Sequence, residues 1–270
     1  MTKTHRSLKT KWLACAAIAM LSSTACPAQS PAAVSRPTPS NEQPASQATS
    51  AGETLKPGEY LTEKGWGRLL LETKNGTLTF SLESTSGGDM CLLDGAIQGD
   101  RGIAKGDAGN YSCSVKFTTN TQGVDVTALT PRECKAFCGY NAGFEAPYLR
   151  VTEGCGREDL DRTRMAFQRL YDGKNYKAAL STLSPLLAKC LPTLEWGEEG
   201  AIRNDLAIVQ YKNGLYAQCL GTLDKYAQDA DLDDDAVTEN WPPILAERYL
   251  AIVRAARTNI GLCRTRLARR

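Results

Sequence analysis

The cysteines are the residues of this chain with the most evident chemistry. The sequence of 270 residues contains ten of them. Cysteines can form disulfides, carry a reactive thiolate or bind a metal. The most closely spaced pair, Cys134-x-x-x-Cys138, has neither the redox spacing C-x-x-C nor the spacing of a zinc pair. Disulfides are therefore the indicated chemistry, provided that the chain folds in an oxidising compartment.

Residues 1–25 predict export to such a compartment. Four basic residues and no acidic one precede an apolar run from Trp12 to Leu21, and small residues follow. This order is typical of a secretory signal peptide. The apolar run is far shorter than the ~20 residues of a membrane-spanning helix.

Cys26 follows this leader directly. The segment from Leu21 to Cys26 resembles a bacterial lipoprotein signal, in which the cysteine becomes the first mature residue and carries lipid, although Ser23 stands where that signal usually has leucine. The alternative is ordinary cleavage after Ala25 or Ala28. Once Cys15 leaves with the leader, Cys26 is the odd cysteine beside eight that can pair completely. This parity favours lipidation of Cys26.

Other site chemistry is sparse. The single histidine, His5, lies in the leader, so the mature chain lacks the commonest general base and metal ligand. The acidic run from Asp229 to Asp235 suits calcium by its carboxylates, but an EF-hand would need glycine at Asp234 and glutamate at Asn240. We therefore expect a solvated loop there, with no metal site, no cofactor and no catalytic residue. A pair of carboxylates for glycoside hydrolysis stays open, because nothing singles out a pair.

The charge of the mature chain is close to neutral. The full sequence has a formal net charge of +2, but without its leader it has 28 basic and 30 acidic residues, a net charge near −2. A near-neutral chain has no electrostatic footprint for nucleic acid. We expect no nucleic-acid partner.

The elements that position these residues fall into two predicted domains after a tether. Residues 26–54 are rich in proline and small polar residues and cannot bury enough apolar surface to fold. In residues 55–155, short apolar or alternating runs recur at intervals of roughly ten residues, and Asn75-Gly76 predicts a tight hairpin. We expect a disulfide-rich antiparallel barrel or sandwich here. The predicted strands are 66–73, 77–83, 90–97, 111–118 and 124–129.

Residues 156–270 have helical periodicity. Two pairs of apolar helical stretches are each joined at a glycine turn, and the turn glycines Gly173 and Gly214 are 41 residues apart. A last helix runs from Ile244 to about Cys263. The repetition predicts stacked helical hairpins and an α+β chain overall.

The eight remaining cysteines divide unevenly between these domains. Five belong to the β region or its end and three to the helical region, so complete pairing requires a bridge across the boundary. An antiparallel helical hairpin returns the chain to its starting end, which predicts a Cys155–Cys190 bridge and, by the same logic, Cys219–Cys263. Three pairings of the other four stay open. Those four are Cys91, Cys113, Cys134 and Cys138.

Two further resemblances concern the domains. The pattern Leu170-Tyr171-x-Gly173-x-x-Tyr176-x-x-Ala179 resembles a tetratricopeptide repeat, and Gln210-Tyr211-x-x-Gly214-x-Tyr216 is a looser copy with its second tyrosine displaced by one residue. Such modules generally bind proteins or peptides. The β region resembles a small cysteine-rich periplasmic module that accompanies lysozyme-inhibitor-like segments. That resemblance depends on Cys91-Leu92-x-x-Gly95, Cys113-x-Val115-x-Phe117 and the segment from Cys134 to Phe144.

Together these observations predict a non-enzymatic lipoprotein that faces the periplasm, is held at the outer membrane through Cys26, and binds a protein partner in the cell envelope. The second resemblance makes a lysozyme or another peptidoglycan hydrolase one candidate partner. The alternatives are a tetratricopeptide-like scaffold for envelope assembly and a hydrolase that uses Asp or Glu side chains.

Overall fold

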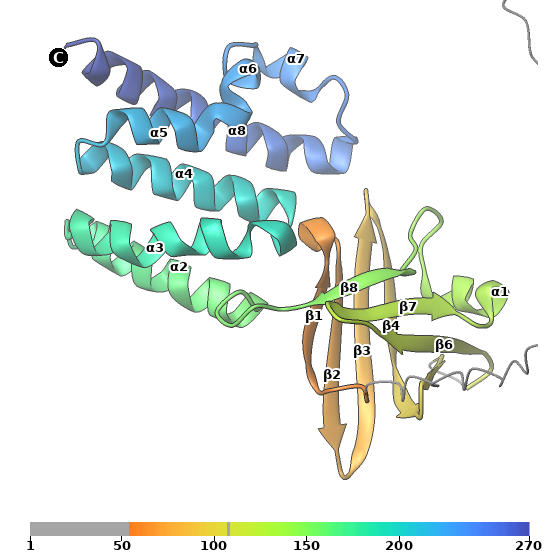
Figure 1. The fold of residues 1–270 in the computed structure, drawn as a ribbon. Helices are drawn as coiled ribbons and strands as arrows, with labels where there is room; N and C mark the ends of the chain where they lie inside the picture. Colours follow the sequence, from red (N-terminus) through yellow and green to blue (C-terminus); the bar gives the residue numbers. More distant parts are fainter. Residues whose placement is uncertain (1–53, 107–108, 270) are drawn as a thin grey trace, which may run out of the picture. The chain divides into compact units, whose positions relative to one another are not determined.

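The computed structural model describes residues 54–106 and 109–269, which form an antiparallel β-barrel followed by a helical region (Figure 1). The predicted α+β class is confirmed, and the barrel rather than the sandwich is observed. The predicted signal peptide of residues 1–25, the lipidation site Cys26 and the tether up to residue 53 lie outside the described residues.

Eight strands close the barrel, each pairing with the next and β1 with β8. The five predicted strands correspond to β2, β3, β4, β6 and β7. The three that the pattern missed, β1, β5 and β8, have five residues each, which is too short for alternation to stand out. The strands are β1 Gly58–Thr62, β2 Gly67–Lys74, β3 Thr77–Ser86, β4 Asp89–Gln98, β5 Arg101–Lys105, β6 Ser112–Thr119, β7 Gly123–Ala128 and β8 Ala146–Arg150.

The β2–β3 hairpin forms where the dipeptide predicted it. Asn75 and Gly76 both have positive φ, 50° and 78°, as a two-residue type I′ turn requires. Lys74 therefore pairs with Thr77, and the register continues along both strands.

Side chains fill the barrel interior. Alternate residues of the strands point inward and form one buried cluster, in which the rings of Phe80 and Phe117 meet edge to face at 5.2 Å. Gly95 and Gly102 leave room for these rings, since a Cβ on Gly102 would lie 2.6 Å from Phe80 and 2.7 Å from Phe117. The interior is thus a packed core like that of other small barrels.

Two disulfides fasten the segment between β7 and β8 to the barrel. This segment contains α1 Pro131–Cys134 and the short 3₁₀ helix η2 Lys135–Phe137. Cys91 of β4 bonds to Cys138, and Cys113 of β6 bonds to Cys134. This is one of the three pairings that the sequence left open.

The helical region begins directly after β8. Helices α2 and α3 pack as one hairpin and α4 and α5 as another, and α8 packs on α4 and α5. Among the described residues, no helix has both the length and the apolar character needed to cross a membrane. The helices are α2 Arg157–Asp172, α3 Tyr176–Cys190, α4 Trp196–Lys212, α5 Tyr216–Leu223, α6 Ala227–Ala230, α7 Asp234–Thr238 and α8 Pro243–Leu267, with short 3₁₀ helices η1 Glu63–Gly65, η3 Leu191–Thr193 and η4 Asp224–Tyr226.

The two hairpins repeat with a period of 40 residues, so the alignment of Gly173 with Gly214 was wrong. The amide of Lys174 donates a hydrogen bond to the backbone carbonyl of Tyr171, and the amide of Gly214 donates one to the backbone carbonyl of Tyr211, at 2.9 and 3.0 Å. Lys174 and Gly214 are also the turn residues with positive φ, 58° and 75°. Gly214 therefore corresponds to Lys174.

In this register the tyrosines of the two copies agree. Tyr171 corresponds to Tyr211 and Tyr176 to Tyr216, so the displaced tyrosine of the sequence alignment disappears. Ala179 corresponds to Cys219, and both are fully buried. A small, fully buried residue therefore stands at this position in both copies.

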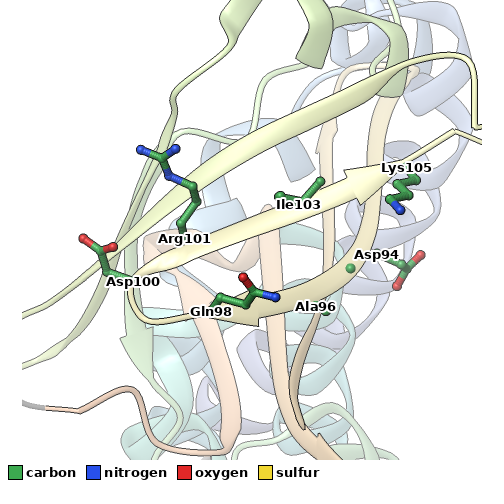
Figure 2. A pocket seen from close by; sticks show the side chains of 8 residues that line it. Asp94, Ala96, Gln98, Asp100, Arg101, Ile103 and Lys105 are labelled. Carbon is green, nitrogen blue, oxygen red and sulfur yellow. The ribbon is translucent and has the colours of Figure 1, made fainter.

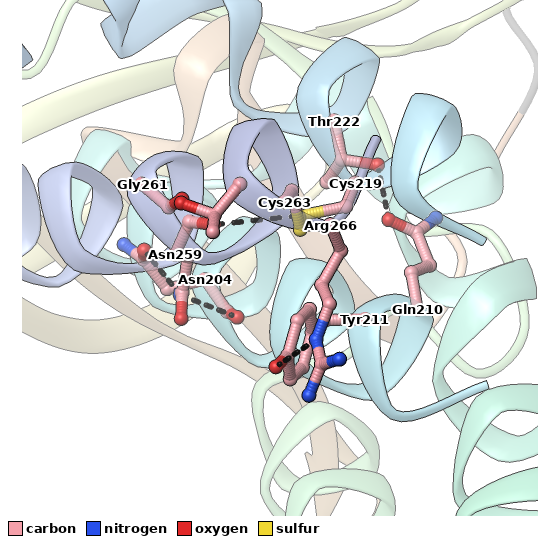
Figure 3. Close-up of a disulfide and its surroundings, with 10 residues drawn as sticks. Asn204, Gln210, Tyr211, Cys219, Thr222, Asn259, Gly261, Cys263 and Arg266 are labelled. Atoms are coloured by element: carbon pink, nitrogen blue, oxygen red, sulfur yellow. Dashed lines mark hydrogen bonds between the residues drawn. A yellow bond between two sulfur atoms is a disulfide. The ribbon is translucent and has the colours of Figure 1, made fainter. Parts of the chain in front are cut away.

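Both predicted helical bridges are present. Cys155 bonds to Cys190 and Cys219 to Cys263, with Cα separations of 5.3 and 6.4 Å. Cys155 is buried in the core of the first hairpin, so its bridge closes that hairpin onto the chain leaving the barrel. Figure 3 shows the second bridge, which ties α5 to α8.

The acidic run is the expected solvated loop only in part, because Asp231 and Asp233 are exposed loop residues while the short helices α6 and α7 flank them. Asp233 accepts a hydrogen bond from the amide of Ala236 and so caps α7. Asp234 forms ion pairs with Arg254 and Arg257 of α8, at 2.7 and 3.0 Å. Asp234 thereby holds α7 against α8, because two arginines of α8 lie within reach.

Candidate binding surface on the barrel wall

The outer wall of the barrel is the most distinctive surface of the described chain. Because successive side chains of a strand point to opposite faces, the residues that alternate with the packed interior point outward. On β4 and β5 these residues line an open hollow (Figure 2).

We call this hollow the strand groove. Its volume is about 720 Å³. Ala96 lies directly across from Ile103, and Gln98 from Arg101, in the antiparallel register of the two strands. The groove residues are Asp94, Gly95, Ala96, Gln98, Asp100, Arg101, Ile103 and Lys105.

A second hollow of about 630 Å³ continues from the first, since Asp94 and Lys105 line both. We call it the aromatic hollow, because Tyr111 and Phe137 meet edge to face at 5.3 Å on its wall. Its remaining lining includes Met90 and Leu92 of β4.

The segment that supplies Phe137 is fixed in place. The Cys91–Cys138 disulfide joins it to β4. The amide of Gly139 also donates to the carbonyl of Met90, at 2.8 Å. The Phe137 side of the aromatic hollow is therefore attached to strand β4.

Several large apolar side chains lie exposed beside one another on this wall. Met90, Leu92, Ile103 and Tyr111 are 45%, 52%, 45% and 42% exposed. Single exposed apolar residues are common, but a contiguous group marks an interaction surface. These four residues all line one of the two hollows.

The charges in the strand groove form no close ion pair within the described chain, although Asp94 lies near enough to Lys74 to help raise the pKa of that lysine. Asp94, Asp100, Arg101 and Lys105 form no ion pair or hydrogen bond through their side chains with any described residue. On the opposite side of the barrel, in contrast, Arg68 and Glu59 form an ion pair at 2.5 Å. The groove charges are thus available to an incoming surface.

The sequence analysis did not single out this wall. Cys91 and Cys138, which support the aromatic hollow, were predicted to form disulfides, and Leu92 entered only through the pattern Cys91-Leu92-x-x-Gly95, with no predicted site role. One signal was available. A half-buried strand has polar residues on its outward parity, whereas β4 has Met90 and Leu92 there in addition to the inward Leu93.

The other predicted site residues lie elsewhere. Cys113 and Cys134 hold α1 against β6, while Cys155, Cys190, Cys219 and Cys263 lie in the helical cores. Cys26 lies outside the described residues. Within residues 54–106 and 109–269, no group of three or more histidine, cysteine or carboxylate side chains is placed to hold a metal.

One buried carboxylate could suggest chemistry, but its contacts are structural. Glu199 of α4 is 3% exposed and forms ion pairs with Arg203 and Lys225, at 2.7 and 2.6 Å. Burial opposes its ionisation, but hydrogen bonds from Lys225 and Arg203 outweigh that cost and hold the pKa of Glu199 below its ordinary value. Glu199 therefore remains charged and joins α4 to the segment after α5.

No protein-family model matches this chain, and neither the curated proteins nor the solved structures contain a significant match. The interpretation of the outer wall therefore depends on its geometry.

Proposed function

We propose that this chain is a non-enzymatic lipoprotein of the bacterial cell envelope that faces the periplasm and binds a protein partner with its barrel wall. The lipid on Cys26, the outer-membrane location and the absence of catalysis are parts of this proposal. Residues 26–54 would act as the tether between membrane and barrel.

The exposed apolar lining of the aromatic hollow carries the proposal. Protein interfaces are organised around aromatic, methionine and aliphatic anchors with a polar rim. Met90, Leu92, Tyr111 and Phe137 supply such a centre, and Asp94 and Lys105 lie at its edge. Because the barrel interior is packed, a small molecule has no lumen to enter, and the wall is the surface that remains.

A lysozyme or another peptidoglycan hydrolase is the first partner to test, on the resemblance of the β region to modules that accompany lysozyme-inhibitor-like segments. The assay is hydrolysis of purified peptidoglycan by lysozyme and by envelope hydrolases, with and without the full chain. We expect wild-type protein to inhibit one of them and Tyr111→Ser to inhibit it less. Met165→Ser is the matched control, because Met165 is an exposed apolar residue of α2, 55% accessible, outside the wall.

Unchanged hydrolysis in every assay would remove hydrolases as the partner. Equal inhibition by wild-type protein and Tyr111→Ser would remove the aromatic hollow as the site. Hydrolysis of peptidoglycan by the chain itself, abolished by one Asp or Glu substitution, would overturn the non-enzymatic proposal.

The second candidate function is a scaffold for envelope assembly through a tetratricopeptide-like helical surface. The 40-residue structural repeat of α2–α3 and α4–α5 supports it, with tyrosines and buried small residues in register. Capture of envelope proteins that depends on the helices and survives substitution of the barrel wall would favour this candidate over the first.

A further inference from the structure

The strand groove contains equal numbers of acidic and basic side chains. Asp94 and Asp100 carry negative charge, and Arg101 and Lys105 carry positive charge. A partner surface of one sign would be repelled by half of these groups. The groove is therefore suited to a surface that also carries both signs.

The register of β4 and β5 gives these charges a symmetry. Ala96 pairs with Ile103, Gly95 with Ala104, and Gln98 with Arg101. Continuation of this register places Asp94 across from Lys105, and both line the groove. Each outward pair thus has one member on β4 and the other on β5.

A two-fold axis along the strand direction exchanges the two members of every pair. If two copies of the groove face each other across such an axis, Asp94 of each copy lies opposite Lys105 of the second copy. The central Ala96 likewise lies opposite Ile103 of the second copy. A self-complementary patch of this kind is what an isologous interface requires.

The composition of the groove agrees with such an interface. Ile103, which is 45% exposed, and the small Ala96 form an apolar centre. Charged side chains surround that centre, as the rim of an interface does. Facing sheets pack ~10 Å apart, a separation that an aspartate and a lysine can bridge.

We propose that the strand groove is the interface of a two-fold homodimer of this chain. The occupant is a second copy because the outward pairs are complementary to themselves and their side chains form no ion pair closer than 4 Å within the described chain. The inference goes beyond the proposed function, since it concerns a different occupant of the barrel wall. Its failure leaves the inhibition assay with Tyr111→Ser untouched.

Charge-reversal variants of two differently tagged full-length chains test this interface by co-purification. The two chains are expressed together, solubilised in detergent and purified through one tag, and recovery of the other tag is measured. The wild-type pair should co-purify. Asp94→Lys expressed with itself, and Lys105→Asp expressed with itself, should each lower recovery by at least about tenfold, because like charges then face each other.

The mixed pair is the decisive arm. Asp94→Lys in one chain and Lys105→Asp in the other again place opposite charges across the axis, so recovery should return to within about twofold of wild type. Lys177→Asp, at an exposed position of α3, controls for charge reversal as such and should co-purify normally. Retention of all disulfides in unreduced gels checks that each variant folds.

Three results would overturn the proposal. The first is a wild-type chain that does not recover its second copy. The second is normal self-recovery of Asp94→Lys or Lys105→Asp, which would place any contact elsewhere. The third is a mixed pair that stays apart although both chains fold.

Discussion

The barrel and the helical region use disulfides for different purposes. In the barrel, backbone pairing closes the fold, and the two bridges attach the segment of residues 131–139 to strands β4 and β6 through cysteines that are part of the buried core. In the helical region, no backbone ladder joins one hairpin to the next, and the bridges connect the helices themselves. The difference suggests that the barrel bridges shape a surface while the helical bridges hold the fold together.

Removal of the Cys219–Cys263 bridge should have the largest effect. It closes 44 residues of chain, and the chain-entropy relation gives a loss of about 4 kcal/mol in the free energy of unfolding for Cys219→Ala with Cys263→Ala. Hydrogen exchange should accelerate in α5 and α8 and stay slow in the barrel strands. If hydrogen exchange accelerates equally in the helices and in the barrel strands, the bridge does not stabilise the helical region alone.

The matched barrel variant is Cys113→Ala with Cys134→Ala. This bridge spans 21 residues, so its loss should cost about 3 kcal/mol by the same relation. Exchange should accelerate in residues 131–139 alone, because hydrogen-bonded strands keep the barrel closed. Opening of β6 in this variant would show that the bridge holds the barrel itself.

Glycine substitutions sharpen the comparison. A Cβ on Gly95 would lie 2.1 Å from the carbonyl oxygen of Ile103, a backbone atom that cannot move independently. Gly95→Ala should therefore destabilise the barrel by about 3 kcal/mol. Gly261 of α8 has nothing within 4 Å of that position, so Gly261→Ala should stabilise by up to about 1 kcal/mol. Thermal unfolding of both variants tests the contrast.

Protonation of Glu199 in acid should weaken the packing of α4. The described barrel buries no carboxylate, whereas α4 buries Glu199 with its two cations. Because the pKa of Glu199 is lowered from 4.5 in the folded state, its stabilisation is complete above pH 4.5 and is lost as the pH falls through the folded-state pKa.

Glu199→Gln tests this acid response. At pH 7 it should cost about 2 kcal/mol, the range of hydrogen bonds to charged groups. As the pH falls below 4.5, the difference between wild type and Glu199→Gln should shrink in urea unfolding. If the two free energies of unfolding instead differ by the same amount from pH 7 to below pH 4.5, the ionised Glu199 is not the source of the stabilisation.

The sequence predicted the elements with strong local signals. Asn75-Gly76 predicted its hairpin because the turn demands positive φ, and the hairpin argument predicted both helical bridges. The predictions failed where contacts between distant parts of the chain determine the local structure. Lys174 occupies a left-handed position that a glycine was expected to mark, and Asp234 is ion-paired because α8 returns beside it.

Only part of the proposed binding wall could be predicted from the sequence, for the same reason. Leu92 and Leu93 are adjacent in the chain, and the closure of the barrel determines that Leu92 is exposed while Leu93 is buried. Tyr111 and Phe137 meet only because disulfides attach a distant segment to the strand ends. No local pattern contains that contact.

The central claim, that the barrel wall is the binding surface, is tested most directly by quantitative capture of envelope proteins on full-length wild type, Leu92→Ser and Met165→Ser. Both substituted side chains are about half exposed, at 52% and 55%, so neither change should lower the melting temperature. A protein captured by wild type and Met165→Ser should decrease more than about tenfold with Leu92→Ser, as at an interface anchor. The same proteins captured equally by all three chains would contradict the claim.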